Sequence, residues 1–350
     1  MHQSILVLIT YLVVFAVNFR YVFCDVVDVP SSPITIVITL LLLFAINLRA
    51  VPKSLILISV ILSVSFCKNP AALAVLDFFL LGFLLRKIPK LDRVLFFNLS
   101  IMLIFVCGLF FLLQMGVVEE VVWVKNGIVA NTLGFSNPNS CALYLYAIIV
   151  SLYYFSPKGI YGFVHKIALI VLAWGAYVYT SSRTGMLGLG LLFLCDVFFR
   201  VKVLRSKIIL YSIPIILIGV SFYLFVNYIE FGELDIILSG RLSYIGRGLA
   251  NIGVVDWLIG FQWQEDIPVD SAYATLLSSC GLLGILIHYI CFIKYIKTIE
   301  NVCIIAIIIS ILLAGLTEYV FVGLNMVTII LLVLIQRHRT DGNLHNSSRI

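Results

Sequence analysis

The chain has 350 residues, of which 62% are hydrophobic and only 11% are charged, and its formal net charge at pH 7 is +6. Soluble domains contain about 45–50% apolar residues and about 25% charged residues. The composition therefore excludes a soluble globular protein and predicts a chain whose main solvent is lipid.

Taken in chain order, the apolar segments predict about twelve membrane-spanning helices of roughly 15–22 residues each. The expected fold is an all-α polytopic membrane protein in which residues 1–350 form one integral membrane domain. The first segment is expected to remain as a span, because it has no basic stretch before it and no small-residue cleavage site. A break at residues 317–319 predicts a tight hairpin between the last two helices. The expected spans are 4–19, 34–48, 54–68, 70–85, 94–116, 138–155, 165–181, 184–199, 208–229, 272–290, 302–316 and 320–336.

The distribution of lysine and arginine predicts which connections face the cytoplasm. With both termini and the polar tail 337–350 on the cytoplasmic side, 17 of the 23 Lys and Arg residues fall inside. This basic face needs no nucleic acid to explain it, and anionic lipid headgroups are its expected partner. Twelve of the 17 Asp and Glu residues fall on the other side. The basic residues expected outside are Arg20, Lys68, Lys125, Arg183, Arg241 and Arg247.

Two of the expected outside connections are long, at residues 117–137 and 230–271. Connections of this length in a compact protein are usually functional or disordered. The second connection mixes polar residues with large apolar ones such as Trp257, Phe261 and Trp263. It is expected to fold as short amphipathic helices that lie on the membrane face.

Three of the outside arginines are candidate anion-binding residues, because a guanidinium binds phosphate through two hydrogen bonds and stays charged. Arg183 follows a run of hydroxyl-bearing residues at the end of a span. Arg241 and Arg247 are six residues apart, or about 120° around a helix, with Tyr244 between them, so these three side chains can face one pocket. The alternatives are that Arg183 only reaches towards the membrane surface, and that the other two arginines pair with nearby carboxylates of the same loop.

Two aspartates have different expected roles. Asp270 ends the long loop, where it can take a proton from a sugar hydroxyl or simply cap the following helix. Asp196, near the inner end of a span, is expected to form an ion pair with Arg200 one turn later. None of the five histidines is expected outside, and His288 lies within a span. The sequence shows neither metal-ligand spacing nor a nucleotide-binding glycine motif, so no metal and no cofactor is expected.

Five short motifs carry a resemblance. They are GFSNPNS at 134–140, TSSRTG at 180–185, SGR at 239–241, DWLIGFQ at 256–262, and DSAY at 270–273 followed by Gly281 and Gly284. In these motifs, in their order and in the position of the long outside loop, the sequence resembles the Wzy-type O-antigen and capsule polymerases. These enzymes share a superfamily with the O-antigen ligases. The resemblance covers about residues 130 to 320.

The resemblance implies a polymerase at the outer face of the bacterial inner (cytoplasmic) membrane. Such enzymes transfer a growing glycan from undecaprenyl diphosphate to the non-reducing end of another lipid-linked repeat unit, and undecaprenyl diphosphate leaves. Membrane lipids surround the enzyme, and a separate chain-length regulator protein is an expected partner. The activated sugar–phosphate bond supplies the energy, which agrees with the absence of a nucleotide motif.

The resemblance also implies roles for single residues. Arg183 and Arg241 match arginines that hold the diphosphates, and Arg247 is a third candidate. The implied substrate-binding residues also include Tyr244, Tyr273, Asn137 and Asn139. The ligases commonly have a histidine where this chain has Asp270, which favours a polymerase over a ligase. A ligase and a lipid-linked glycan flippase or transporter remain the alternatives.

Overall fold

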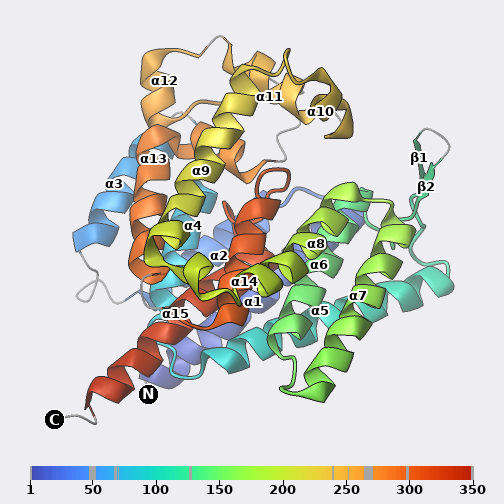
Figure 1. Cartoon of the computed structure of the whole chain (residues 1–350), viewed down its shortest axis with the longest axis horizontal. Coiled ribbons are helices and arrows are strands. Elements are labelled where there is room, and N and C mark those ends of the chain that lie inside the picture. The colour runs from blue at the N-terminus through green and yellow to red at the C-terminus, as the bar shows by residue number, and fades with distance from the viewer. Residues whose placement is uncertain are drawn as a thin grey trace.

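The computed structural model describes residues 2–46, 53–66, 69, 71–125, 128–238, 240–250, 252–263, 271–296 and 299–347. The described chain is almost entirely helical, with one two-stranded sheet. In Figure 1 the start of α1 and the end of α15 lie at the lower left, and three short helices, α10 to α12, lie along the top.

The first third of the chain forms five helices. Several of their large apolar side chains, such as Phe44, Phe96 and Phe111, remain exposed. In a chain of this composition that exposure is expected where side chains face lipid. Asn18 of α1 donates a buried hydrogen bond to Asn98 of α5, which links two long helices. The bounds are α1 His2–Val27, α2 Ser32–Ala45, α3 Lys53–Phe66, α4 Ala72–Leu85 and α5 Leu91–Gln114.

The middle of the chain begins with a small β-hairpin, which the hydropathy pattern did not predict. Its two strands pair antiparallel within the 117–137 connection. Asn137 then caps α6, and Pro138 occupies the first turn, where a missing N–H costs nothing. Ser206 caps α9 in a similar way. The bounds are β1 Trp123–Lys125, β2 Ile128–Ala130, α6 Pro138–Tyr154, α7 Ile160–Thr180, α8 Arg183–Phe198, the 3-10 helix η2 Lys202–Arg205, and α9 Lys207–Val226.

The connection 230–271 contains three short helices, as predicted. They are α10 Gly232–Ile237, α11 Arg241–Leu249 and α12 Val254–Ile259. The chain then enters α13, Ala272–Ile296, which is kinked at Gly281, where φ is +62°. The expected ion pair between Asp196 and Arg200 is also confirmed, at 3.0 Å, and Lys166 joins it at 2.7 Å.

The predicted tight hairpin between the last two helices is wrong. α14, Val302–Ala314, and α15, Met326–Ser347, are separated by an irregular segment, residues 315–325, which we call the α14–α15 connection. Most of it is buried. Buried backbone needs hydrogen-bond partners. Thr328 of α15 supplies them through its Oγ1, which donates to the carbonyls of Val320 and Gly323, and Asn325 Nδ2 within the segment donates to that of Tyr319.

Each of the twelve expected spans overlaps one helix of the structure. Among the described residues, five helices are long and apolar enough to cross a membrane, and several others are shorter and apolar. The chain is therefore an all-α membrane protein. The five long helices are Gln3–Val27, Leu91–Gln114, Ile160–Thr180, Lys207–Val226 and Ala272–Lys294.

Candidate functional site

A buried ion pair joins the long loop to the α14–α15 connection. Arg241 is the first residue of α11, and its Nη2 lies 3.3 Å from Oε1 of Glu318. Both residues are buried, and the exposed fractions of their side chains are 9% for Arg241 and 11% for Glu318. A buried charge is tolerated only with a counter-charge and hydrogen bonds, and both residues make further interactions beyond this pair. The structure thus places one of the predicted arginines at a buried, charged position.

Local features fix the position of α11. The carboxylate of Asp235 accepts hydrogen bonds from the backbone N–H groups of Leu242, at 2.8 Å, and Ser243, at 3.1 Å. It therefore caps the start of α11, whereas the ion pair of Arg241 is with Glu318. Gly246 allows the helix to approach the end of α9, because a Cβ there would lie 2.4 Å from the carbonyl oxygen of Phe225.

The motif at 256–262 packs α12 against the kink in α13. Gly260 has a φ of +102°, and a Cβ on it would lie 2.5 Å from the carbonyl oxygen of Ser278. A Cβ on Gly281 would lie 2.3 Å from the carbonyl oxygen of Leu258. Phe261 N donates to Ser278 O at 2.7 Å. The two glycines therefore permit a backbone-to-backbone contact that no other residue would allow, and their role here is to anchor the loop.

The start of α13 is fastened to the same connection that carries Glu318. Ala272 N donates to the carbonyls of Gly315, at 2.9 Å, and Glu318, at 3.2 Å. Ser271 Oγ also donates to Gly315 O, at 3.3 Å. The middle of the long loop, at α11, and its end, at the start of α13, therefore both contact the α14–α15 connection. Asp270, the candidate base, lies outside the described residues.

Tyr244 and Arg247 lie on the exposed side of α11. The Arg247 guanidinium stands over the Tyr244 ring, 5.3 Å from its centroid, and Nε donates to the Ser243 carbonyl at 3.1 Å. Arg241, by contrast, is buried. The two arginines of α11 therefore occupy different environments, one inside the protein and one on its surface.

A second group of motif residues meets between α6 and α8. Asn137 Oδ1 accepts from the backbone N–H of Asn139 at 2.7 Å, and Asn139 Oδ1 accepts from Ser182 Oγ at 3.0 Å. The motifs at 134–140 and 180–185, about 40 residues apart in sequence, are thus in direct contact. Arg183 begins α8 immediately after Ser182, but its side chain lies outside the described residues.

The structure also contains a cavity, lined by charged and hydroxyl groups as well as by many apolar side chains, that the sequence-based prediction missed. Its volume is about 740 Å³, and its walls come from α1, α2, α3, α4 and the α14–α15 connection. Arg20 contributes the positive charge and Asp25 the negative charge. We call this space the Arg20 cavity. The sequence signal for this cavity was Arg20 itself. It is one of the few basic residues expected on the outer side, and its position in the sequence alone indicated no role for it.

Hydrogen bonds hold both charged groups of the Arg20 cavity. Arg20 Nη1 donates to Thr35 Oγ1 at 2.9 Å, and Nη2 donates to the carbonyl of Leu324. The Asp25 carboxylate accepts from the N–H and hydroxyl of Ser136, at 3.1 and 2.8 Å, and from the Ser140 hydroxyl at 3.4 Å. The cavity is therefore tied to the GFSNPNS motif through Asp25.

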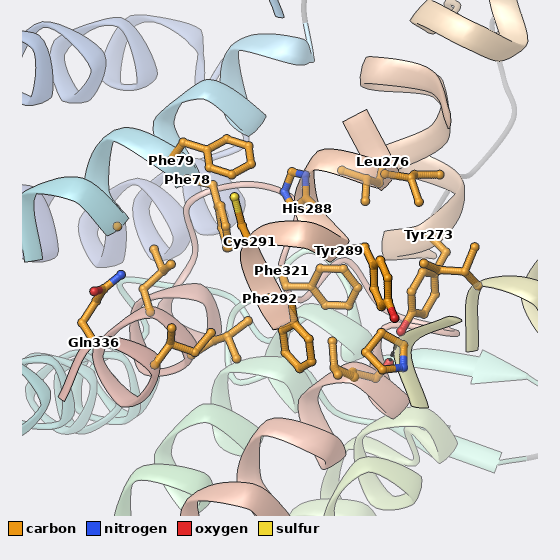
Figure 2. A pocket seen from close by; sticks show the side chains of 18 residues that line it. Phe78, Phe79, Tyr273, Leu276, His288, Tyr289, Cys291, Phe292, Phe321 and Gln336 are labelled. Carbon is orange, nitrogen blue, oxygen red and sulfur yellow. Dashed lines mark hydrogen bonds between the residues drawn. The ribbon is translucent and has the colours of Figure 1, made fainter. Parts of the chain in front are cut away.

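Tyr273 lies in a different place from the other predicted residues. It is 2% exposed, its hydroxyl donates to the Leu312 carbonyl at 3.0 Å, and it lines an apolar cavity of about 80 Å³ between α4, α9, α13, α14 and α15. Figure 2 shows this cavity with the rings of Phe78, Phe79 and His288 on one wall. His288, whose Nδ1 is 3.1 Å from the Gly284 carbonyl, lies among these apolar groups.

No group of three or more His, Cys, Asp or Glu side chains among the described residues is arranged to hold a metal ion. What the arrangement offers instead is a set of guanidinium, carboxylate and hydroxyl groups around one connection. Such groups bind anions and polyhydroxylated molecules.

No known protein family matches the chain, and no curated protein and no solved structure is detectably similar to it.

Proposed function

We propose that the protein is a membrane glycosyltransferase that polymerises undecaprenyl-diphosphate-linked oligosaccharide repeat units of O-antigen or capsule. Its place is the outer face of the bacterial inner membrane. The observation that carries the proposal is the buried Arg241 guanidinium, held against Glu318 where the long loop meets the α14–α15 connection. A guanidinium in a water-poor site is well suited to the charge of a leaving diphosphate.

The reaction needs four events at this place. A hydroxyl oxygen at the non-reducing end of the acceptor forms a bond to the anomeric carbon of the donor. The bond from that carbon to the diphosphate oxygen breaks, and undecaprenyl diphosphate leaves with the bonding electrons. The hydroxyl proton passes to a base, for which Asp270 is the sequence-based candidate. Arg241 stabilises the negative charge that grows on the diphosphate.

The other motif arginines would assist at the same reaction. Arg247 is exposed on α11, where it can contact the diphosphate of an arriving substrate. Arg183 starts α8 beside the Asn139–Ser182 contact, and we propose it as the second diphosphate-binding arginine. Asn137 and Asn139 use their side-chain oxygens locally, so their proposed contribution is to shape this corner.

The test uses purified protein in lipid nanodiscs with the host's own lipid-linked repeat units. Wild-type protein should lengthen them into a ladder and release undecaprenyl diphosphate. Arg241→Ala should form no ladder. The matched control is Arg200→Gln, which removes an exposed arginine whose partner Asp196 keeps its contact with Lys166. It should polymerise as the wild type does.

Other outcomes would identify the alternatives. Transfer of one finished glycan to a lipid A core acceptor, with no lengthening, would show a ligase. Movement of intact lipid-linked units across the bilayer without any new glycosidic bond would show a flippase. Either result would refute the polymerase proposal. In a strain that lacks the gene, a normal ladder of surface polysaccharide would refute it as well.

A further inference from the structure

We infer that the Arg20 cavity binds the sugar residues of the acceptor glycan, an inference that rests on the proposed function. The cavity volume, about 740 Å³, lies within the usual range for small-molecule sites, about 300–1,000 Å³. It also lies next to the ion pair that we propose for the donor diphosphate, as the following contacts indicate.

The walls of the cavity offer donors and acceptors on several sides. Arg20 supplies a guanidinium from α1, and Asp25 supplies a carboxylate less than two turns later on the same helix. Exposed Ser31 and Ser32 add hydroxyls at the start of α2, and Asn325 lines the cavity from the α14–α15 connection. A ligand with many hydroxyl groups can both donate to and accept from such walls.

The same walls disfavour the other parts of a lipid-linked substrate. A polyprenyl chain has no polar atoms to satisfy the groups of Arg20 and Asp25. A diphosphate would be attracted by Arg20 but repelled by the Asp25 carboxylate of the same wall, so this pair of opposite charges suits a neutral ligand better than an anion. Sugar rings meet neither objection, because their hydroxyls are neutral and are both donors and acceptors.

The cavity and the ion pair share one short piece of backbone. Tyr319 lines the cavity, and its neighbour Glu318 pairs with Arg241. A glycan in the cavity would therefore end beside the proposed donor diphosphate, which is where an acceptor hydroxyl must lie for the transfer.

A native thiol makes the inference testable without any assay of polymerisation. Cys24 lines the cavity, and it is a free, half-buried cysteine. In a variant whose other cysteines are replaced by serine or alanine, a polar maleimide would report on access to this thiol. The probe ligand is the lipid-free oligosaccharide repeat unit, released by mild acid from the host's lipid-linked intermediates. A control reporter is Glu119→Cys in a fully cysteine-free background, because Glu119 is exposed and does not line the cavity.

The expected result is protection of Cys24. With the oligosaccharide at about ten times its Kd, labelling should slow about tenfold, because only unliganded protein reacts. Labelling of Glu119→Cys should not change. Unchanged labelling of Cys24 at every oligosaccharide concentration up to its solubility limit would overturn the inference.

Two cavity variants separate binding from folding. Arg20→Gln should raise the Kd measured by protection about tenfold or more, because it removes a charged donor. Ala74→Trp should also raise it, by filling the cavity without removing a hydrogen bond, since Ala74 lines the wall. If the oligosaccharide protects Cys24 in the Ala74→Trp variant with the same Kd as in the wild type, the inference is overturned, even if Arg20→Gln does not fold.

The outcomes for the two proposals are distinct. Polymer formation without protection of Cys24 would refute the acceptor site and leave the polymerase standing. Protection without polymer formation would refute the polymerase and leave a glycan-binding cavity.

Discussion

The two arginines that the α14–α15 connection contacts are held in different ways. Arg241 is buried against the carboxylate of Glu318, so its charge is compensated within the protein. Arg20 is half-buried, and its hydrogen-bond partners among the described residues are a hydroxyl and a backbone carbonyl, from Thr35 and Leu324. The positive charge of Arg20 therefore faces a cavity, and within the part of the chain that the structure describes no carboxylate bonds to it directly.

The difference suggests two uses of the same residue type. An anion that binds Arg241 must compete with Glu318, which keeps this arginine ordered until a stronger anion such as a diphosphate arrives. Arg20 needs no such exchange and can hydrogen-bond a neutral ligand directly. Because the α14–α15 connection contacts both arginines, substitutions at the Arg241–Glu318 ion pair should be compared with substitutions at the Arg20 cavity.

The largest expected effect comes from breaking the buried ion pair. Arg241→Met leaves the Glu318 carboxylate buried without this partner, which typically costs about 3–5 kcal/mol. We expect a clear fall in the thermal midpoint of the detergent-solubilised protein and a loss of polymerisation. Thermal unfolding followed by size-exclusion chromatography measures the first, and the ladder assay measures the second.

The double variant Arg241→Met with Glu318→Leu separates stability from chemistry. Replacing both charges by apolar groups should recover most of the lost stability, whereas polymerisation should stay absent. A double variant that regains both would show that the arginine has only a structural role. A single variant as stable as the wild type would contradict the burial of the pair.

The second effect tests the backbone contact that anchors the long loop. Gly281→Ala puts a Cβ 2.3 Å from the Leu258 carbonyl oxygen, at a φ of +62° that disfavours side chains. We expect a loss of about 2–4 kcal/mol from strain and overpacking together. Limited proteolysis should then cut the 230–271 loop faster, while protection of Cys24 by the oligosaccharide remains.

The control for that variant is Gly219→Ala in α9. A Cβ at Gly219 would meet nothing within 4 Å, and the residue is inside a helix. Alanine should therefore be neutral or slightly stabilising there. Equal proteolysis of the Gly281 variant and the wild type would show that the α12–α13 contact does not hold the loop.

The third effect is on the cavity side. Asp25→Asn keeps an oxygen acceptor but removes the charge that accepts hydrogen bonds from Ser136 and Ser140. Hydrogen bonds to charged groups are worth about 1.5–3 kcal/mol each, so part of that should be lost. We expect a moderate fall in thermal midpoint and weaker protection of Cys24. Unchanged protection would mean that the carboxylate is not needed for the ligand.

Hydropathy and charge were enough to predict the helical framework. Each expected span overlaps a helix, because long apolar segments in lipid have few other ways to satisfy their backbone groups. The predicted short helices of the 230–271 loop are also present. The α14–α15 connection was wrongly predicted to be a tight hairpin, because its apolar residues resemble the start of a span. In the structure its backbone is irregular, and the side chains of Thr328 and Asn325 satisfy part of it.

The candidate site was less predictable because its contacts join distant segments. Arg241 was expected to pair, if at all, within its own loop, but Glu318 is 77 residues away. Asp235, whose carboxylate is closer to Arg241 in the sequence, caps α11 instead. The Arg20 cavity needed the three-dimensional structure, since Arg20 and Leu324 are 304 residues apart. Spacing along the chain carries no information on such pairs.

The smallest effect on stability should come from Arg247→Gln. Arg247 is exposed, and its described contacts are the Tyr244 ring and its own helix backbone at Ser243. Exposed contacts of this kind contribute little to folding, so the thermal midpoint should not change. If Arg247 contacts the diphosphate of the arriving donor, the KM for the lipid-linked donor should rise while kcat changes little. Kinetics with donor varied at fixed acceptor would measure this. A fall in kcat at unchanged KM would instead place Arg247 with Arg241, at the charge that develops during the transfer.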